Sequence, residues 1–311
     1  MSVSTASQPG LASRLVSGFL AVKPLFNLAK HQARQMMIDR AEKLGVPWRQ
    51  QAETLLSRNW ETEFTRVHDP QLSYPEYYLR PFHAYDGGNL SWQAAVEVEV
   101  AACAVHAKIW PEAGVEGDNR LRQSYNDVLR ASLPADLRDI VDLGCSVGMS
   151  TLALQQLYPS AKITGVDLSP YFLAVAQYNT QKWQQQGYPL PAWVHAPAEA
   201  TNLPENSFDL VSLCLICHEL PRVATQEIFQ EARRILRPGG YIAVMDMNPN
   251  SEVIARMPPF VFTLLKSTEP YLDEYFSLNL EQALTDAGFQ LLTVTSNSPR
   301  HRTAIAFNSE Q

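Results

Sequence analysis

Apolar positions follow a helical period in the first part of the chain. Between Leu11 and Leu44 they recur every three or four residues, which predicts helix, and Pro24 either starts a new helix or bends the first one. Residues 69–92 are rich in Tyr, Pro and His without a clean period, so an ordered loop with two turns is expected there. We therefore expect residues 1–135 to form a mainly helical N-terminal extension. Further helices are predicted at Trp48–Asn59, Trp92–Trp110 and Arg120–Ser132.

From residue 139 onward, short apolar runs alternate with helical segments. Strands are predicted at Ile140–Leu143, Lys162–Asp167, Ala192–His195, Phe208–Leu215, Tyr241–Met247, Gln290–Thr295 and Thr303–Phe307. Helices are predicted at Ser150–Tyr158, Tyr171–Gly187, Ala224–Leu236 and Leu280–Ala287. Such alternation predicts a mainly parallel sheet with helices on both faces. The sequence thus predicts a doubly wound, Rossmann-like α/β domain of seven strands over residues 136–311, with a capping insert at 248–278.

A glycine-containing turn follows the first predicted strand, in the run from Val141 to Gly148 (VDLGCSVG). Glycine lets the backbone approach a ligand closely, and the start of the next helix offers free N–H groups to an anion. The spacing is G-x-x-x-G, which differs from the G-x-G-x-x-G of dinucleotide-binding proteins. A strand–turn–helix without a ligand remains the alternative interpretation of this run.

An acidic residue, Asp167, ends the second predicted strand about 20 residues after the glycine turn. A carboxylate in this place can accept two hydrogen bonds from the hydroxyls of a ribose. Alternatively, Asp167 caps the helix that follows. Ser169 can also fill the capping role, which would leave Asp167 for a ligand.

These motifs, together with AEATNLPENSFDLVS and RILRPGGYIAVMD, resemble class I S-adenosylmethionine (SAM)-dependent methyltransferases. Over roughly residues 138–247, the order and spacing are most similar to the ubiquinone/menaquinone-biosynthesis type. The resemblance implies SAM as cofactor, with the glycine turn and Cys214–Leu215 at its methionine end. It further implies that Asp167 binds the ribose, Leu168 packs on the adenine, and Ala198 and Glu199 lie at the adenine edge. The implied cofactor-binding residues are Asp142, Gly144, Cys145, Gly148, Asp167, Leu168, Ala198, Glu199, Cys214 and Leu215.

Two positions depart from the family pattern. Ser146 stands where the family usually has a second glycine of the turn, and this substitution narrows the range of backbone conformations that the turn can adopt. Pro197 stands where the family often has Asp, which puts the recognition of the adenine amino group in doubt.

His218 and Glu219 follow the fourth predicted strand and are the candidate catalytic residues. Ligands of open α/β sheets bind beyond the carboxyl ends of the strands, so both side chains should face the reacting centre. Methyl transfer to an oxygen or carbon acid requires a base, and imidazole has a suitable intrinsic pKa. The alternative is that His218 caps a turn and Glu219 is solvated.

The N-terminal extension and the insert at 248–278 are the candidate lid over the strand ends. Both are rich in aromatic side chains, which suit a planar or isoprenoid-like small molecule. Any one of these rings could equally serve to pack the two parts together. The candidate substrate-binding residues are Tyr78, His83, Tyr85, Asp246, Phe262 and Tyr271.

The charge distribution bears on the partners. The net charge of −7 argues against a general nucleic-acid binder, which needs a clustered basic face. Residues 1–50 nevertheless hold seven Lys or Arg against two Asp or Glu. Segment 11–43 therefore either docks on the acidic remainder of the chain or on another subunit, or lies as an amphipathic helix on an anionic membrane. The oligomeric state is left open, with a homo-oligomer among the alternatives.

The remaining signals favour a cytoplasmic protein, membrane-associated only if that helix binds lipid. No signal peptide is recognised, and no apolar run reaches the ~18 residues that span a bilayer. The chain has four cysteines, and its single C-x-x-C, Cys214–Cys217, has no second pair to complete a zinc site. We expect reduced thiols and no metal.

The function that these signals favour is methyl transfer from SAM to a small, aromatic or lipophilic molecule. A protein methyltransferase is disfavoured because the Asn/Asp-Pro-Pro-Tyr signature of amide methylation is absent after the fourth strand. A SAM-binding protein without catalysis stays open, and a NAD-dependent dehydrogenase is disfavoured by the glycine spacing.

Overall fold

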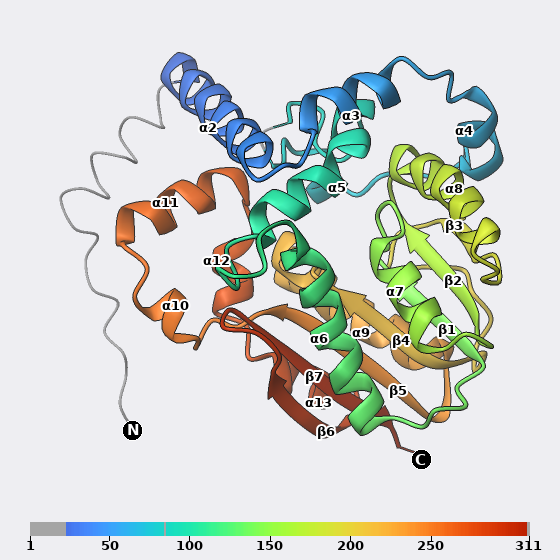
Figure 1. The fold of residues 1–311 in the computed structure, drawn as a ribbon. Helices are drawn as coiled ribbons and strands as arrows, with labels where there is room; N and C mark the ends of the chain where they lie inside the picture. The colour runs from blue at the N-terminus through green and yellow to red at the C-terminus, as the bar shows by residue number, and fades with distance from the viewer. Residues whose placement is uncertain (1–22, 84, 310–311) are drawn as a thin grey trace.

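The structure is a computed structural model that describes residues 23–83 and 85–309. A helical region, most of which lies in the upper part of Figure 1, precedes an α/β sheet domain, and the last helix of this region runs down along the sheet. The helical region contains α2 (Lys23–Lys43), α3 (Trp48–Leu56), α4 (Glu61–Val67), η1 (Glu76–Leu79), α5 (Trp92–His106), η2 (Gly114–Glu116) and α6 (Gly117–Ser132). The predicted helical segment before Lys23 lies outside the described residues.

Seven strands form one sheet in the order β3-β2-β1-β4-β5-β7-β6. The first five run parallel, and β7 is antiparallel to both β5 and β6. The strands are β1 (Asp139–Leu143), β2 (Lys162–Asp167), β3 (Ala192–His195), β4 (Phe208–Cys214), β5 (Leu236–Met247), β6 (Phe289–Ser296) and β7 (His301–Asn308). The connecting helices are α7 (Met149–Leu157), α8 (Pro170–Gln185), η3 (Cys217–Glu219), α9 (Arg222–Ile235), α10 (Glu252–Ala255), α11 (Pro259–Thr268), α12 (Leu272–Phe276) and α13 (Leu280–Asp286). The predicted fold class is confirmed.

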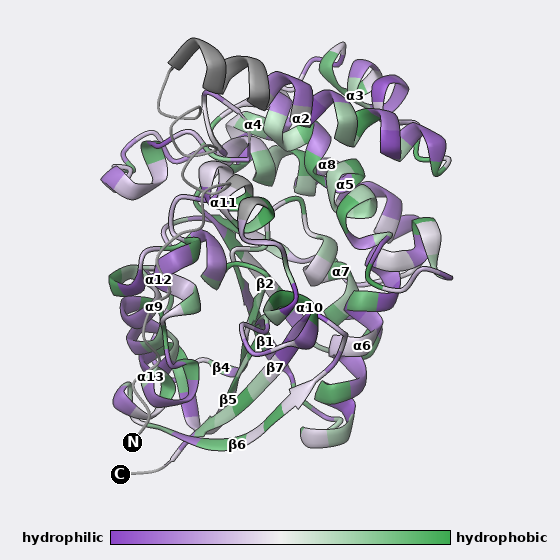
Figure 2. Ribbon diagram, turned by 90° about the vertical axis from the view of Figure 1, so that its left-hand side faces the viewer, coloured by the Kyte–Doolittle hydropathy of each residue, from purple (hydrophilic) through white to green (hydrophobic). Residues whose placement is uncertain are grey.

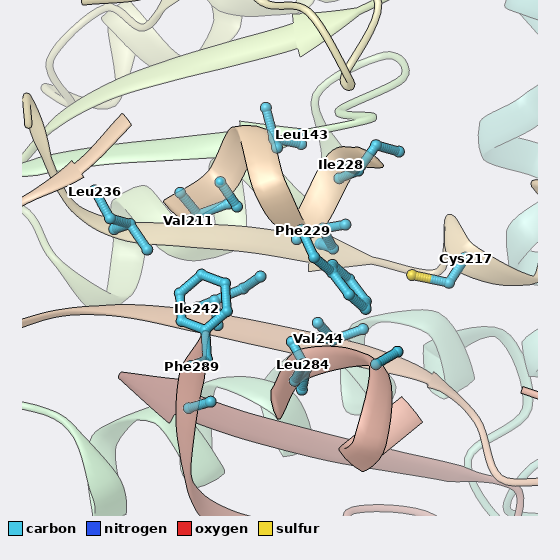
Figure 3. Packing of buried hydrophobic residues seen from close by; sticks show 14 of the residues in the cluster. Leu143, Val211, Cys217, Ile228, Phe229, Leu236, Ile242, Val244, Leu284 and Phe289 are labelled. Carbon is cyan, nitrogen blue, oxygen red and sulfur yellow. The ribbon is translucent and has the colours of Figure 1, made fainter. Parts of the chain in front are cut away.

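Apolar side chains bury both faces of this sheet. On one face, Ile228 and Phe229 of α9 and Leu284 of α13 pack on Val211 and Val244 of the central strands (Figure 3). On the other face, α6 and α7 pack on the same strands, as the edge-on view in Figure 2 shows. Both faces of the central strands β1 and β4 are buried, which explains why their sequences are largely apolar rather than alternating.

Two boundaries differ from the prediction by four residues or more, and one helix was not predicted, each for a local reason. Strand β5 begins at Leu236 rather than Tyr241, because Leu236 already pairs with Phe208 of β4. The register then shifts before Tyr241 pairs with Leu210, and the Pro-Gly-Gly residues lie within this irregularity. Helix α5 ends at His106, before Pro111, which cannot continue a helix. Helix α4 was not predicted because ETEFTRV has no clean apolar period.

Helix α2 docks on the protein through a buried ion pair. Arg34 contacts Glu97 of α5, whose second carboxylate oxygen accepts a hydrogen bond of 2.8 Å from the Tyr85 hydroxyl. The Glu97 side chain is only 4 % exposed. For residues 23–43, docking on the chain is therefore the arrangement observed. No helix within residues 23–83 and 85–309 is both long and apolar enough to cross a bilayer.

We predict that Arg34→Met lowers the free energy of unfolding by about 2–3 kcal/mol, because it leaves the Glu97 carboxylate buried without its cation. Urea denaturation measures the loss. Arg49→Met is the matched control, since Arg49 forms an exposed pair with Asp39 at 2.6 Å and should cost less than about 1 kcal/mol. Equal losses in the two variants would contradict a stabilising role of the buried pair.

Candidate active site

A cavity of about 730 Å³ lies at the carboxyl ends of the parallel strands. This volume is typical of sites that enclose a small molecule. Its walls come from the glycine turn, from the ends of β2 and β4, from η3, from the helical N-terminal region and from the 248–278 insert. Segments that are far apart in the sequence thus share one hollow.

Most of the predicted site residues line this cavity. Those that do are Gly144, Cys145, Asp167, Leu168, Ala198, Glu199, Cys214, Leu215, His218, Glu219, Tyr78, His83, Tyr85 and Phe262. The other four do not line the cavity but contact residues that do or lie next to them in the chain. Asp142 and Gly148 support the glycine turn, Asp246 pairs with His218, and Tyr271 packs edge-on against Tyr77.

The glycine turn is held in a conformation that few residues adopt. Gly144, Ser146 and Gly148 have φ values of +70°, +50° and +87°. A Cβ atom on Gly144 would lie 2.1 Å from the Cδ1 atom of Ile216, and the φ of +70° is one that other residues rarely adopt, so a substitution there would be strained. Ser146 occupies the left-handed region although it is not glycine, and the departure from the family pattern is therefore accommodated without a change of turn.

Asp167 connects this turn to the start of α8. One carboxylate oxygen accepts a hydrogen bond from the Ser146 N–H and the other from the Ser169 N–H, both at 2.8 Å. Ser169 itself caps α8, since its hydroxyl accepts from the Phe172 N–H at 3.2 Å. Burial raises the pKa of Asp167 to about 6, against these hydrogen bonds, which favour the carboxylate. Each oxygen keeps a lone pair that can accept a ligand hydroxyl.

Several buried polar atoms around the turn have no partner among the described residues. They are the Ser146 hydroxyl, one oxygen of Asp142 and one oxygen of Glu199. The other Asp142 oxygen accepts from the hydroxyls of Ser150 and Thr151, and the other Glu199 oxygen accepts from the Tyr77 hydroxyl at 2.6 Å. Of these residues, Ser146 and Glu199 line the cavity, and because unpaired buried acceptors are costly, the cavity is suited there to a polar ligand that donates hydrogen bonds.

Arg122 of α6 reaches the same end of the cavity and was missed by sequence reasoning. Asp118 holds its guanidinium, with 2.9 Å between Nε and the carboxylate, and raises the pKa of Arg122 although burial opposes the charge. Of its two terminal nitrogens, one faces only the sulfur of Cys214, at 3.8 Å, and the other lies 3.7 Å from the sulfur of Met149 and 3.3 Å from Asp118. Sulfur is a weak acceptor, so this cation keeps donors for a carboxylate. No motif surrounds Arg122 that could have revealed it.

His218 and Asp246 form a pair at the end of β4 and β5. The Nδ1 atom of His218 lies 2.8 Å from Asp246, which is fully buried and also accepts from the backbone N–H groups of His218 and Met247. Burial opposes the imidazolium, but the Asp246 carboxylate outweighs it and raises the pKa of His218 to about 10. His218 is therefore a cation at neutral pH, and its Nε2 atom has no hydrogen-bond partner among the described residues.

Two further carboxyl groups lie beside this pair. Glu219 and Glu269 are 3.8 and 3.9 Å from the Nε2 atom of His83. Burial raises the pKa of Glu219 to about 8 and also raises the pKa of Glu269. Burial lowers the pKa of His83, and the nearby His218 adds to that effect. Glu269 belongs to the insert and stands in no motif, so the sequence did not indicate it.

The wall beyond these groups is mainly apolar and aromatic. Phe262 of α11 stacks on Phe276 of α12 with ring centroids 5.2 Å apart. Tyr78 lines the cavity, and burial raises the pKa of its hydroxyl. Cys217 lies in η3, beyond the fourth strand, and the described cysteines are all free thiols. The described residues contain no cluster of His, Cys, Asp and Glu that could hold a metal.

Comparisons with known proteins agree with this fold. A methyltransferase domain family matches residues 141–244. The uncharacterised methyltransferase sll0829 of Synechocystis sp. is 30 % identical over 153 residues, covering 49 % of this chain and 67 % of the relative. The trans-aconitate 2-methyltransferase of Azoarcus sp. is 34 % identical over 127 residues, 41 % of this chain and 46 % of the relative. The solved pyocyanin biosynthetic protein PhzM shares the fold, with a TM-score of 0.50, 18 % identity and coverage of 66 % and 61 %.

We predict that NMR titration of the His218 imidazole gives a pKa near 10, and that Asp246→Asn lowers this pKa. Without the Asp246 carboxylate, burial disfavours the charged ring, and only the smaller effects of Glu269 and Glu219 oppose it. A wild-type ring that titrates near 6.5 would contradict the pairing. Circular dichroism of the variant checks that the loss of the buried carboxylate leaves the fold intact.

Proposed function

Because the chain belongs to the SAM-dependent methyltransferases, we propose that it transfers the SAM methyl group to an acidic oxygen of a small, lipophilic or aromatic molecule. The observation that carries this proposal is the shared cavity, which joins the glycine turn and Asp167 at one end to the His218–Asp246 pair and the aromatic wall at the other. The trans-aconitate specificity named for one relative is consistent with a small acid as acceptor.

The residues present fit the methyl donor. The hydroxyl of Ser146 and the free oxygen of Glu199 are buried acceptors without partners, and both residues line the cavity. We propose that Asp167 accepts from the ribose hydroxyls, that Glu199 lies at the adenine edge, and that Arg122 binds the carboxylate of the methionine portion. Bound SAM supplies an electrophilic methyl group on a sulfonium and leaves as a neutral thioether.

His218 then has a different role from the general base expected of a free imidazole. With a pKa of about 10 it is already protonated at neutral pH, so it cannot take up the acceptor proton. We propose that its Nε2–H donates to the acceptor oxygen, which favours binding of the acceptor in its ionised form and orients that oxygen toward the methyl group. Asp246 fixes the ring and its charge through Nδ1. Acceptors that ionise readily, such as phenols, enols and carboxylic acids, are therefore favoured.

Glu219 helps to select the acceptor. Its pKa of about 8 keeps most of the side chain protonated at neutral pH, so it can donate a hydrogen bond to a second oxygen of the substrate. The finer similarity, to methyltransferases of ubiquinone and menaquinone biosynthesis, remains a proposal. It is supported by the apolar, aromatic wall, which suits a ring with an isoprenoid-like tail.

The test is transfer of radiolabelled methyl from SAM into a cell extract that is then separated into organic-soluble molecules and protein. We expect label in the organic fraction, and His218→Gln should reduce the rate about 100-fold or more while SAM binding is retained. Label in the protein pellet would instead indicate a protein methyltransferase. SAM binding without any transfer would indicate a protein that binds SAM without catalysis.

We also predict that SAM affinity depends on the ionisation of Asp167. Since its pKa is about 6, calorimetry should show constant affinity above pH 7 and a loss approaching tenfold per pH unit below pH 6. Asp167→Asn should remove this acid limb and weaken binding at pH 7.5 by roughly 1.5–3 kcal/mol, the cost of losing charge-assisted hydrogen bonds.

Arg122→Met is the control for that experiment. It should weaken SAM binding at the opposite end of the ligand and leave the acid limb near pH 6 in place. An acid limb that persists in Asp167→Asn would show that another group causes it and that the ribose assignment is wrong.

A further inference from the structure

Five arginines line the large cavity, and they differ in what neutralises them. Arg34 pairs with Glu97, Arg122 with Asp118, and Arg80 with Glu76 at 3.5 Å. The remaining two, Arg40 and Arg300, have no carboxylate partner among the described residues. The Arg40 guanidinium donates only to the sulfur of Met37, at 3.9 Å, and the Arg300 guanidinium donates only to the carbonyl of Lys108, at 3.3 Å.

Arg40, Lys108 and Arg300, which we term the cationic rim, form a continuous feature. Arg300 is joined to Lys108 by the hydrogen bond just described, and Lys108 and Arg40 line the same small hollow beside the cavity. The carboxylate in that hollow, Asp39, already pairs with Arg49 at 2.6 Å and with Gln35 at 3.0 Å. Burial lowers the pKa of Arg300, as expected for a cation that has lost water without gaining an anion.

The rim stands where the cavity opens to solvent, and apolar side chains flank it. Met36 and Val105 line the cavity, yet they are 61 % and 44 % exposed, which marks the opening. Leu44, in the adjoining hollow, is also exposed. Exposed apolar groups next to unpaired cations favour a ligand that is itself partly apolar and partly anionic.

We propose that the cationic rim binds an anionic group, a carboxylate or a phosphate, carried by the lipophilic substrate at a point remote from the methylated oxygen. The inference rests on the proposed function, since it takes the cavity to be the substrate site. The apolar wall would hold the body of the molecule, and the rim would fix its outer end. Arg300 favours a ligand inside the cavity over a membrane surface, because it lines the cavity and is only partly exposed.

Calorimetry with dodecanoate, methyl dodecanoate and dodecyl phosphate, all below their micellar concentrations, tests the proposal. In the wild-type protein we expect both anions to bind at least tenfold more tightly than the ester, and the tighter of the two identifies the preferred group. Arg300→Gln and Arg40→Gln should each reduce this preference several-fold, and the preference should weaken with added salt. Arg80→Gln is the control, because Arg80 lines the cavity but already pairs with Glu76. This variant should retain the preference for the anions over the ester.

The outcomes separate this inference from the methyltransferase proposal. Loss of anion preference in Arg40→Gln or Arg300→Gln with unchanged SAM affinity supports the rim. Equal binding of acid and ester by the wild-type protein, or a preference that survives both substitutions, overturns the proposal that the cationic rim binds an anion. Neither result bears on the proposed SAM site. Binding to phosphatidylserine vesicles that requires Arg40, without binding of monomeric anions, overturns it in favour of a membrane contact. Failure to bind SAM at all would instead overturn the proposed function.

Discussion

The carboxylate of Asp167 is the constraint on which the candidate site depends. Strands β1 and β2 are parallel neighbours, and Leu143 pairs with Val166 at their carboxyl ends. The chain must turn sharply after each of them, and Asp167 holds both turns through the N–H groups of Ser146 and Ser169. The Val166 carbonyl accepts two further bonds, from Gly144 and Cys145. The turn is thus preorganised by the sheet, and burial of the carboxylate is tolerated because backbone donors stabilise its charge.

The charged groups at the other end of the cavity are also compensated by their surroundings. His218 and Asp246 neutralise each other, while burial raises the pKa values of Glu219 and Glu269 and so favours their uncharged forms. An apolar cavity disfavours separated charges. Transfer of a methyl group from a sulfonium to an oxyanion converts two charges into two neutral products, so such surroundings assist that reaction more than water does. The aromatic wall therefore contributes to the proposed chemistry as well as to binding.

The sequence predicted the parts of this architecture that local patterns encode. The strands of residues 162–167 and 192–195 agree with the prediction to the residue, because apolar runs and turn residues bound them closely. Predicted site residues that follow strand ends, such as Asp167 and His218, line the cavity because parallel strands end at the same edge of a sheet. Their roles toward a ligand remain predictions.

Contacts between distant segments could not be predicted in this way. Glu269, Arg122 and Asp246 acquire their significance from partners 186, 92 and 28 residues away, namely His83, Cys214 and His218. The raised pKa of His218, which reverses its expected role, arises from the Asp246 carboxylate and is therefore a tertiary property. An unpredicted short helix such as α4 is likewise stabilised by packing, with Phe64 against Tyr171, rather than by its own sequence period.

The excess of basic residues in the first 50 positions shows how one sequence signal can have several physical causes. Arg34 is buried against Glu97 and fixes α2 to α5, whereas Arg49 forms an exposed pair that contributes little. Arg40, on the same helix as Arg34, has no carboxylate partner among the described residues and lines the cavity instead. Docking of the helix by Arg34 is what carries Arg40 to the cavity opening. The charge asymmetry of the sequence therefore combines a structural anchor with a charge left available for a ligand, and only the tertiary structure distinguishes the two.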